Sequence, residues 1–172
     1  MKSWGLPLLV GLIFGIIVWQ ASLVALPRVI MAAAIDRIAA GGGINRMRHA
    51  ALATPVNQPI VRPSPDLAYS SCPFDVSDGP VRVHVMPAPA RYSSLSVFDA
   101  RTDVVFVRND RQAGGKPFDV VIARPGQAVP AGVEVIRIGS DRGIALIRLL
   151  LANPAEIGSL GALRRQSWCA AI

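Results

Sequence analysis

Residues 6–26 read LPLLVGLIFGIIVWQASLVAL, an apolar run without a charged residue that decides how the rest of the chain is organised. Because an α-helix rises about 1.5 Å per residue, about 20 apolar residues cross the hydrocarbon core of a bilayer. Trp4 and Trp19 lie towards the two ends, where indole rings often meet the membrane interface. The run therefore predicts one transmembrane helix that holds everything after it at a membrane.

A cleaved secretory signal is the alternative interpretation of this run. The apolar stretch is longer than the roughly 7–15 residues usual in such signals, and only Lys2 precedes it. Small residues at 32–34 nevertheless leave room for a cleavage site. We expect an uncleaved anchor, residues 1–26.

The net charge of +7 is unevenly distributed along the 172 residues. Residues 1–63 carry six basic side chains and one acidic, whereas residues 64–172 carry twelve basic and ten acidic. The basic excess belongs to the membrane-proximal part, where anionic lipid headgroups are the expected partner. The nearly neutral remainder argues against a nucleic-acid partner.

A stem, residues 27–63, is expected to join the anchor to a folded domain. Pro27 marks a possible kink, an alanine-rich run at 29–40 continues as helix, and the glycines at 41–43 end it as a hinge. A phosphate-binding loop is the sharper interpretation of these glycines, but no lysine-serine pair or preceding strand supports it. Prolines then favour an extended linker up to the domain, namely Pro55, Pro59, Pro63 and Pro65.

The remaining part, residues 64–172, is predicted to be an α+β domain with about six antiparallel strands. Val81, Val83 and Val85 alternate with polar residues, which is the pattern of a half-buried strand. Similar short runs, separated by turn residues, recur at near-regular spacing. The expected strands are residues 67–76, 81–86, 92–99, 104–107, 118–123 and 133–138.

Two C-terminal helices are expected to close the domain. The first covers residues 140–151, with a capping residue at its start and apolar residues at helical spacing. The second begins at 153–156, where Asn-Pro-Ala-Glu places a cap, a proline at the first position and a glutamate at the third. We expect it to lay Ile157, Leu160 and Leu163 over the sheet.

The two cysteines, Cys72 and Cys169, form no CxxC motif and have no metal-type spacing to a histidine. One disulfide bond, which requires an oxidising compartment, and two buried free thiols are both compatible with them. The sequence predicts no metal site.

No specific catalytic motif is present, so the sequence assigns no catalytic residue and no cofactor and leans away from an enzyme. His49 and His84 are the only histidines, and neither lies in a G-x-S-x-G or similar context. Aspartates at 66, 75, 78, 99 and 103 could form a carboxylate cluster, but turns favour aspartate at several of these positions.

Five side chains are the candidate ligand-binding residues: Asp66, Tyr69, Tyr92, Asp99 and Arg148. The two tyrosines could face one another across the sheet, although ordinary cross-strand packing explains them as well. Arg148 lies in an apolar run and is expected to pair with an acid such as Asp99 or to reach solvent. A ligand-binding arginine is the alternative.

One group of motifs is distinctive: Ser-Pro-Asp at 64–66, Tyr-Ser at 69–70, Asp-Val-Ser-Asp-Gly-Pro at 75–80, then Tyr92 and Asp99. Together they resemble the bacterial domain-of-unknown-function family twelve fifty-four. The six residues at 75–80 are the most specific part.

The resemblance covers roughly residues 62–165 and implies a mainly antiparallel β fold. In larger members a second uncharacterised β domain, domain of unknown function twelve fourteen, often follows, and here a separate partner chain could provide it. The resemblance implies an export-side location for some relatives, but no reaction and no catalytic residues.

The compartment is argued from two opposing signals. Arginines at 28, 37, 46 and 48 follow the apolar run, and the positive-inside rule would keep the domain in the cytoplasm. The family resemblance and the paired thiols point the other way and outweigh this bias. We expect an inner-membrane protein whose domain faces the periplasm, with Cys72 and Cys169 bonded.

Two functional hypotheses remain. The first is a membrane-tethered binding or accessory module that docks a partner protein. The alternative is an enzyme or small-ligand-binding protein whose site is shared with a second chain. An exposed apolar patch would favour the first, and a polar cleft the second.

Overall fold

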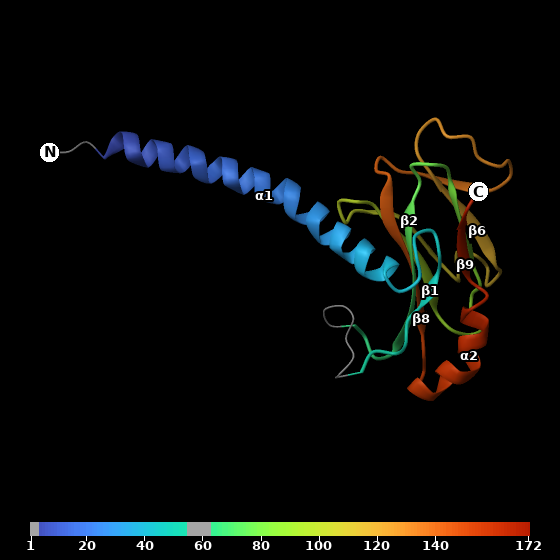
Figure 1. The fold of residues 1–172 in the computed structure, drawn as a ribbon. Helices are drawn as coiled ribbons and strands as arrows, with labels where there is room; N and C mark the ends of the chain where they lie inside the picture. Colours follow the sequence, from blue (N-terminus) through green and yellow to red (C-terminus); the bar gives the residue numbers. More distant parts are fainter. Residues whose placement is uncertain (1–3, 55–62) are drawn as a thin grey trace.

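The computed structural model describes residues 4–54 and 63–172 as one long helix that projects from a β-sheet body (Figure 1). Only the C-terminal end of the helix reaches this body. Pro55 and Pro59 of the expected linker, and Lys2, lie outside the described residues. The elements are α1 (Gly5–Ala39), β1 (Arg48–His49), β2 (Leu67–Asp75), β3 (Val81–Val85), β4 (Ser93–Phe98), β5 (Val104–Asn109), β6 (Phe118–Ala123), β7 (Glu134–Arg137), β8 (Arg142–Leu150), η1 (Pro154–Glu156), α2 (Ile157–Arg164) and β9 (Trp168–Ala171).

The expected anchor and the alanine-rich run after it form one continuous helix, α1, which passes through Pro27. Its 35 residues correspond to about 52 Å at about 1.5 Å per residue, well beyond a hydrocarbon core of roughly 30 Å. The apolar part is not buried against the protein. It is long and apolar enough to cross a membrane, as an anchor does and as a signal sequence near an N-terminus also can.

The last turns of α1 are different, because they pack on the β body. Met31 and Ile35 are buried and form a small apolar cluster with Ile144 of β8. The helix then ends at the glycines, as predicted. The N–H of Gly43 donates to the carbonyl of Ala39 (2.6 Å), and its φ of +90° turns the chain in a way that favours glycine.

Two sheets make up the β body and enclose the main core between them. The five-stranded sheet has the order β1-β2-β8-β4-β5 and is antiparallel throughout. The four-stranded sheet has the order β7-β6-β3-β9, with one parallel pair, β6 and β7. Buried side chains of both sheets form the core. The predicted α+β class with mainly antiparallel strands is confirmed.

All six predicted strands are present, with ends that differ from the prediction by no more than a few residues. The alternation at Val81, Val83 and Val85 is that of β3, whose valines are buried in the core. A register shift between Val97 and Phe98 marks a bulge where β4 pairs with β5.

The first predicted C-terminal helix is wrong, because residues 142–150 form β8, a central strand of the five-stranded sheet. Ile144 belongs to the cluster under α1, whereas Ile147 belongs to the core between the sheets, so the two lie on opposite faces. A strand with apolar side chains on both faces has an almost continuous apolar sequence, and a few of its residues can also fall at helical spacing.

Gly143 shows why this strand fits its place. A Cβ atom there would overlap the carbonyl oxygen of Phe98 and the ring of Phe74. The absence of a side chain lets β4 and the core approach β8 closely.

The second predicted helix is confirmed as η1 followed by α2. The side chain of Asn153 accepts a hydrogen bond from the N–H of Ala155 (3.1 Å), as a capping residue does. Ile157, Leu160 and Leu163 pack on a second apolar cluster at the β body, as expected.

Two short strands were not predicted. β1 lies in the segment expected as a linker and pairs with the edge of β2. β9 pairs with β3 at the edge of the other sheet, and Cys169 on β9 forms a disulfide with Cys72 on β2, with a Cα–Cα distance of 6.5 Å. The bond therefore joins the two sheets through the core.

Candidate functional site

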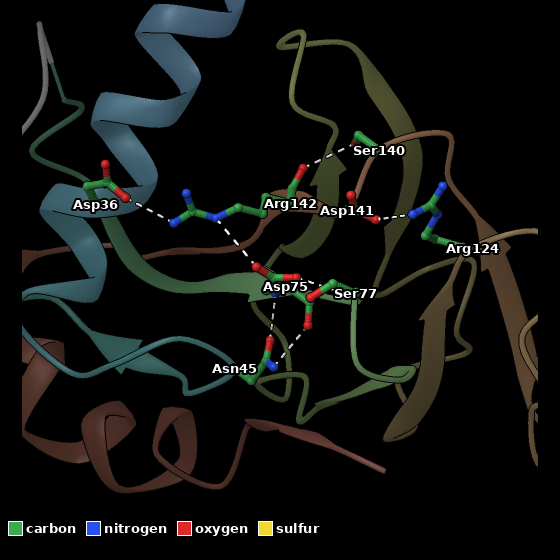
Figure 2. A network of polar contacts seen from close by, with 8 residues as sticks. All are labelled: Asp36, Asn45, Asp75, Ser77, Arg124, Ser140, Asp141 and Arg142. Atoms are coloured by element: carbon green, nitrogen blue, oxygen red, sulfur yellow. Dashed lines mark hydrogen bonds and ion pairs between the residues drawn. The ribbon is translucent and has the colours of Figure 1, made fainter.

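The motif at 75–80, the most specific sequence of the chain, forms the turn between β2 and β3. The N–H of Ser77 donates to the carboxylate of Asp75 (2.9 Å), a local hydrogen bond typical of turns. Asn45, which lies outside this turn in the sequence, binds the backbone of Asp75. Its side chain accepts from the N–H of Asp75 (2.8 Å) and donates to the carbonyl of Asp75 (3.0 Å) (Figure 2). The motif thus has a structural role in this fold.

The same turn takes part in the junction between α1 and the β body (Figure 2). Arg142 at the start of β8 lies between two carboxylates, with distances of 2.9 Å to Asp36 of α1 and 3.7 Å to Asp75. Asp141 pairs with Arg124 at 2.5 Å in the neighbouring loop. The polar contacts and the apolar cluster beneath α1 together hold its last turns against the sheet.

A hollow of about 290 Å³ lies beside the motif. Its lining includes Asp75 and Asp78 of the motif together with Ala171 and Ile172. Across residues 4–54 and 63–172, no group of three His, Cys, Asp or Glu residues is placed to hold a metal ion. Asp75 is already bound within its own turn, whereas the side chain of Asp78 has no hydrogen bond or ion pair among the described residues.

The second polar group lies on the outer face of the five-stranded sheet, the face turned away from the four-stranded sheet. Tyr69 on β2, Arg148 on β8 and Ser94 on β4 are cross-strand neighbours in one row. Arg148 donates to the hydroxyl of Ser96 (3.1 Å), and its buried Nε has no hydrogen-bond partner within residues 4–54 and 63–172. The buried hydroxyl of Ser94 likewise has no partner in this part of the chain.

Tyr92 completes this face, because it lies two residues before Ser94 and its carbonyl accepts from the N–H of Leu150 (2.9 Å). The structure therefore brings three of the five candidate residues, Tyr69, Tyr92 and Arg148, to one surface. The tyrosines do not face each other directly, since β8 lies between their strands.

Apolar side chains surround this row and remain exposed. Val107 of β5 is 52% exposed and Leu150 of β8 is 41% exposed. β5 is also the last strand of its sheet, so one side of its backbone has no strand neighbour among the described residues. We call the surface beyond α1 the open end of the outer face; its exposed or partly exposed residues are Tyr69, Tyr92, Val107, Arg148 and Leu150, and Ser94 and Ser96 are buried within it.

Asp99 does not belong to this surface. Its carboxylate accepts from the N–H groups of Arg101 (2.7 Å) and Asp103 (3.1 Å) and closes the turn between β4 and β5. The expected pairing of Arg148 with Asp99 is therefore wrong, because local backbone donors occupy that carboxylate. Asp66 precedes β2, and its carbonyl accepts from the N–H of Leu151 (2.9 Å).

His49 has a buried partner that the sequence did not indicate. Its Nδ1 lies 2.8 Å from the hydroxyl of Ser70, a residue that is fully buried. Burial, followed by the positive charges of Arg164 and Arg165, lowers the pKa of His49, while a hydrogen bond to the backbone of Ser167 acts in the opposite direction. A serine without access to solvent cannot attack a substrate, so this pair is structural.

His84 belongs to a polar group on the other sheet. Its Nδ1 lies 2.9 Å from the carboxylate of Asp119, which also accepts from Arg82 (3.0 Å), and its ring stacks on Trp168 at 5.7 Å. Burial raises the pKa of Asp119, but the hydrogen bonds from His84 and Arg82 outweigh it, and the net pKa is lowered. The register that pairs β3 with β6 and β9 creates this group.

Comparisons with known proteins add a family and a fold. The family model described as Protein of unknown function (DUF1254) matches residues 44–171. The chain is similar to the crystal structure of the VPA0106 protein from Vibrio parahaemolyticus, with a TM-score of 0.57 and 23% identity over 63% of this chain and 28% of that one. A further similar structure, an uncharacterised protein from Burkholderia cenocepacia, has a TM-score of 0.47 and 14% identity over 64% of this chain and 33% of that one. No curated protein matches.

The likeness to the Vibrio protein supports the fold of the β body. In both comparisons this chain spans about a third or less of the other protein's length.

Proposed function

The chain belongs to the family of proteins of unknown function DUF1254, and we propose that it is a membrane-anchored binding module that docks a partner protein on the open end of the outer face. One observation carries this proposal. The open end combines exposed apolar side chains, such as Val107 and Leu150, with a partly buried arginine, Arg148. Clusters of exposed apolar side chains are characteristic of protein-binding surfaces, and arginine is enriched among residues that dominate binding energy.

The packing of the β body against the last turns of α1 also supports a membrane-anchored binding module. Ile35 is buried and Arg142 bridges Asp36 and Asp75, so the last turns of the helix and the sheet are held together. The apolar part of α1 lacks protein contacts that would bury it. A membrane anchor fixed in this way would present the open end in a constant orientation to the bilayer.

We assign the domain to the periplasmic side of an inner membrane. The disulfide between Cys72 and Cys169 supports this placement, because such bonds persist in oxidising compartments. Basic residues of the stem would then lie near anionic headgroups. Fusions of alkaline phosphatase and of a fluorescent protein to the C-terminus test this: phosphatase activity is expected, and fluorescence with an inactive phosphatase would contradict it.

The partner could carry the second uncharacterised β domain that larger relatives have. This chain spans 28% of the Vibrio protein, so at least one similar protein contains much additional chain. The alternative, a ligand site shared with a second chain, has the hollow beside the motif in its favour, but Asp78 is the one carboxylate residue of its lining without a side-chain partner among the described residues.

Site-specific photo-crosslinking tests the docking surface. p-Benzoylphenylalanine is placed at Val107 on the open end, or at Ala131, an exposed residue between β6 and β7, as the matched control. In cells of the native host we expect a discrete protein adduct from position 107 and none of the same mass from position 131. Equal labelling from both positions, or no adduct from position 107, would refute the docking surface.

A further inference from the structure

We propose that Arg148 is the receptor for a carboxylate of the docked partner, an aspartate or glutamate side chain that enters the open end between β8 and β4. This inference rests on the proposed function, since it gives the chemistry of the partner for the same surface. It goes further by assigning the recognition to one guanidinium and the hydroxyl of Ser94.

The first argument is that Arg148 lacks a counter-ion. Its one hydrogen bond to a described side chain is to the neutral hydroxyl of Ser96. None of the ion pairs formed within residues 4–54 and 63–172 includes it. The segment 55–62 contains no aspartate or glutamate in its sequence. A partly buried guanidinium without a carboxylate has lost part of its hydration, and no ion pair compensates for this loss.

The second argument is the set of unused donors beside it. The Nε of Arg148 and the hydroxyl of Ser94, which is directly opposite it in the register, are buried without a hydrogen-bond partner among the described residues; the Nε of Arg142 is equally unpartnered, so Ser94 is the feature particular to this row. Ser94 itself is 1% exposed. A carboxylate has two acceptor oxygens and can accept from a guanidinium in bidentate geometry while a hydroxyl donates to it as well. Because both groups are covered in the unbound chain, an entering carboxylate reaches them only if the side chain of Arg148 moves on docking.

The third argument comes from the surroundings, which favour a protein side chain over a lipid headgroup. Tyr92, Val107 and Leu150 are exposed around the row, and Arg148 is the cation within it. Recognition of an anionic membrane surface normally uses several basic side chains together. One arginine within an apolar rim is the arrangement expected at the centre of a protein interface.

The experiment combines the crosslinker at Val107 with changes at Arg148 in the full, membrane-bound chain. Arg148→Gln removes the charge, Arg148→Lys keeps the charge without the planar fork, and Arg165→Gln removes a charge from an exposed position near the end of α2. We expect the yield of the protein adduct to fall at least tenfold in Arg148→Gln, by an intermediate factor in Arg148→Lys and not measurably in Arg165→Gln. Retention of the Cys72–Cys169 disulfide on non-reducing gels shows that each variant is folded.

Mass spectrometry of the adduct then gives the partner's residues next to the crosslink. An acidic residue there, whose change to the amide in the partner lowers the yield as Arg148→Gln does, supports the proposal. An unchanged yield in Arg148→Gln would overturn the carboxylate receptor and leave the docking surface intact. An adduct with lipid instead of protein would also overturn it, and the absence of any adduct in the unaltered chain would refute the proposed function itself.

Discussion

Arg142 and Arg148 lie on the same strand, six positions apart, and both are on the outer face of the five-stranded sheet, yet their surroundings differ completely. Arg142 lies at the covered end, beneath α1, where it donates a hydrogen bond to Asp36 and lies 3.7 Å from the carboxylate of Asp75. Arg148 lies at the open end and has a serine hydroxyl as its partner among the described side chains. One end of this face is therefore covered by the chain's own helix, and no described helix covers the other end.

The largest expected effect should not distinguish the two ends. The disulfide joins β2, a strand of the sheet that carries both ends, to β9 of the other sheet. Changing both Cys72 and Cys169 to alanine is expected to lower the free energy of unfolding by about 3–5 kcal/mol, because the bond closes a long loop. Denaturant titration of the full chain in detergent micelles measures this, with the reduced unaltered protein as control. A variant as stable as the unaltered protein would show that the bond does not hold the sheets together.

The second prediction compares how much unfolding free energy is lost when an apolar side chain is shortened at the buried, covered end and at the exposed, open end. Ile35 is 1% exposed in the cluster under α1, whereas Leu150 is 41% exposed at the open end. Ile35→Ala is expected to lower the free energy of unfolding by about 2–5 kcal/mol because it leaves a cavity. Leu150→Ala is expected to change it by no more than about 0.5 kcal/mol. The same titration compares the two variants, and similar losses would mean that the open end is also packed.

The two arginines themselves provide a finer comparison. Arg142→Gln removes ion pairs to Asp36 and Asp75 that are partly exposed, so a loss of about 0.5–1 kcal/mol in unfolding free energy is expected. Arg148→Gln removes no ion pair and should change stability by less than about 0.5 kcal/mol. Hydrogen exchange of the last turns of α1 should accelerate only in Arg142→Gln. If Arg148→Gln proved the more destabilising variant, Arg148 would be structural and the comparison would fail.

The smallest expected effect is a pH dependence of stability that comes from His49 on β1, the edge strand of the five-stranded sheet. Burial and the charges of Arg164 and Arg165 lower the pKa of His49 in the folded protein, so the unfolded chain binds this proton more readily. The stability that depends on a neutral His49 is fully present above the pKa of the unfolded chain, about 6.5. It is lost as the pH falls towards the lower pKa of the folded protein, because the unfolded chain then takes up the proton first. The denaturation midpoint should therefore decrease between pH 7 and pH 5, and less so in His49→Gln. An equal decrease in both proteins would assign the pH dependence to other groups.

Local patterns in the sequence were sufficient for much of the fold. The alternation in β3 predicted a strand because its valines meet one core face, and the residues at 153–156 predicted a helix start because capping involves only near neighbours. β8 was mistaken for a helix because its outer face also carries apolar side chains, such as Ile144 and Leu150, so the strand lacks alternation, and its neighbours come from distant parts of the chain.

The candidate site shows the same division. Tyr69, Tyr92 and Arg148 were named as candidates from the sequence, and the sheet order brought them to one face. Ser94 and Ser96 were missed, because serine in a strand gives no signal until its cross-strand neighbour is known. Asp99 was a misleading candidate, since its carboxylate satisfies the backbone of its own turn.

The sequence by itself determined the long apolar helix, the antiparallel class of the domain and the family, because these depend on composition, short periodicity and contiguous motifs. Only the tertiary structure decided which charges are paired. Arg142 meets Asp36 across 106 positions of the chain, while Arg148, on the same strand, meets no carboxylate of the described part. The physical reason is that an ion pair depends on a few ångströms between side chains, and only the order and register of the strands place residues so far apart in sequence at that distance.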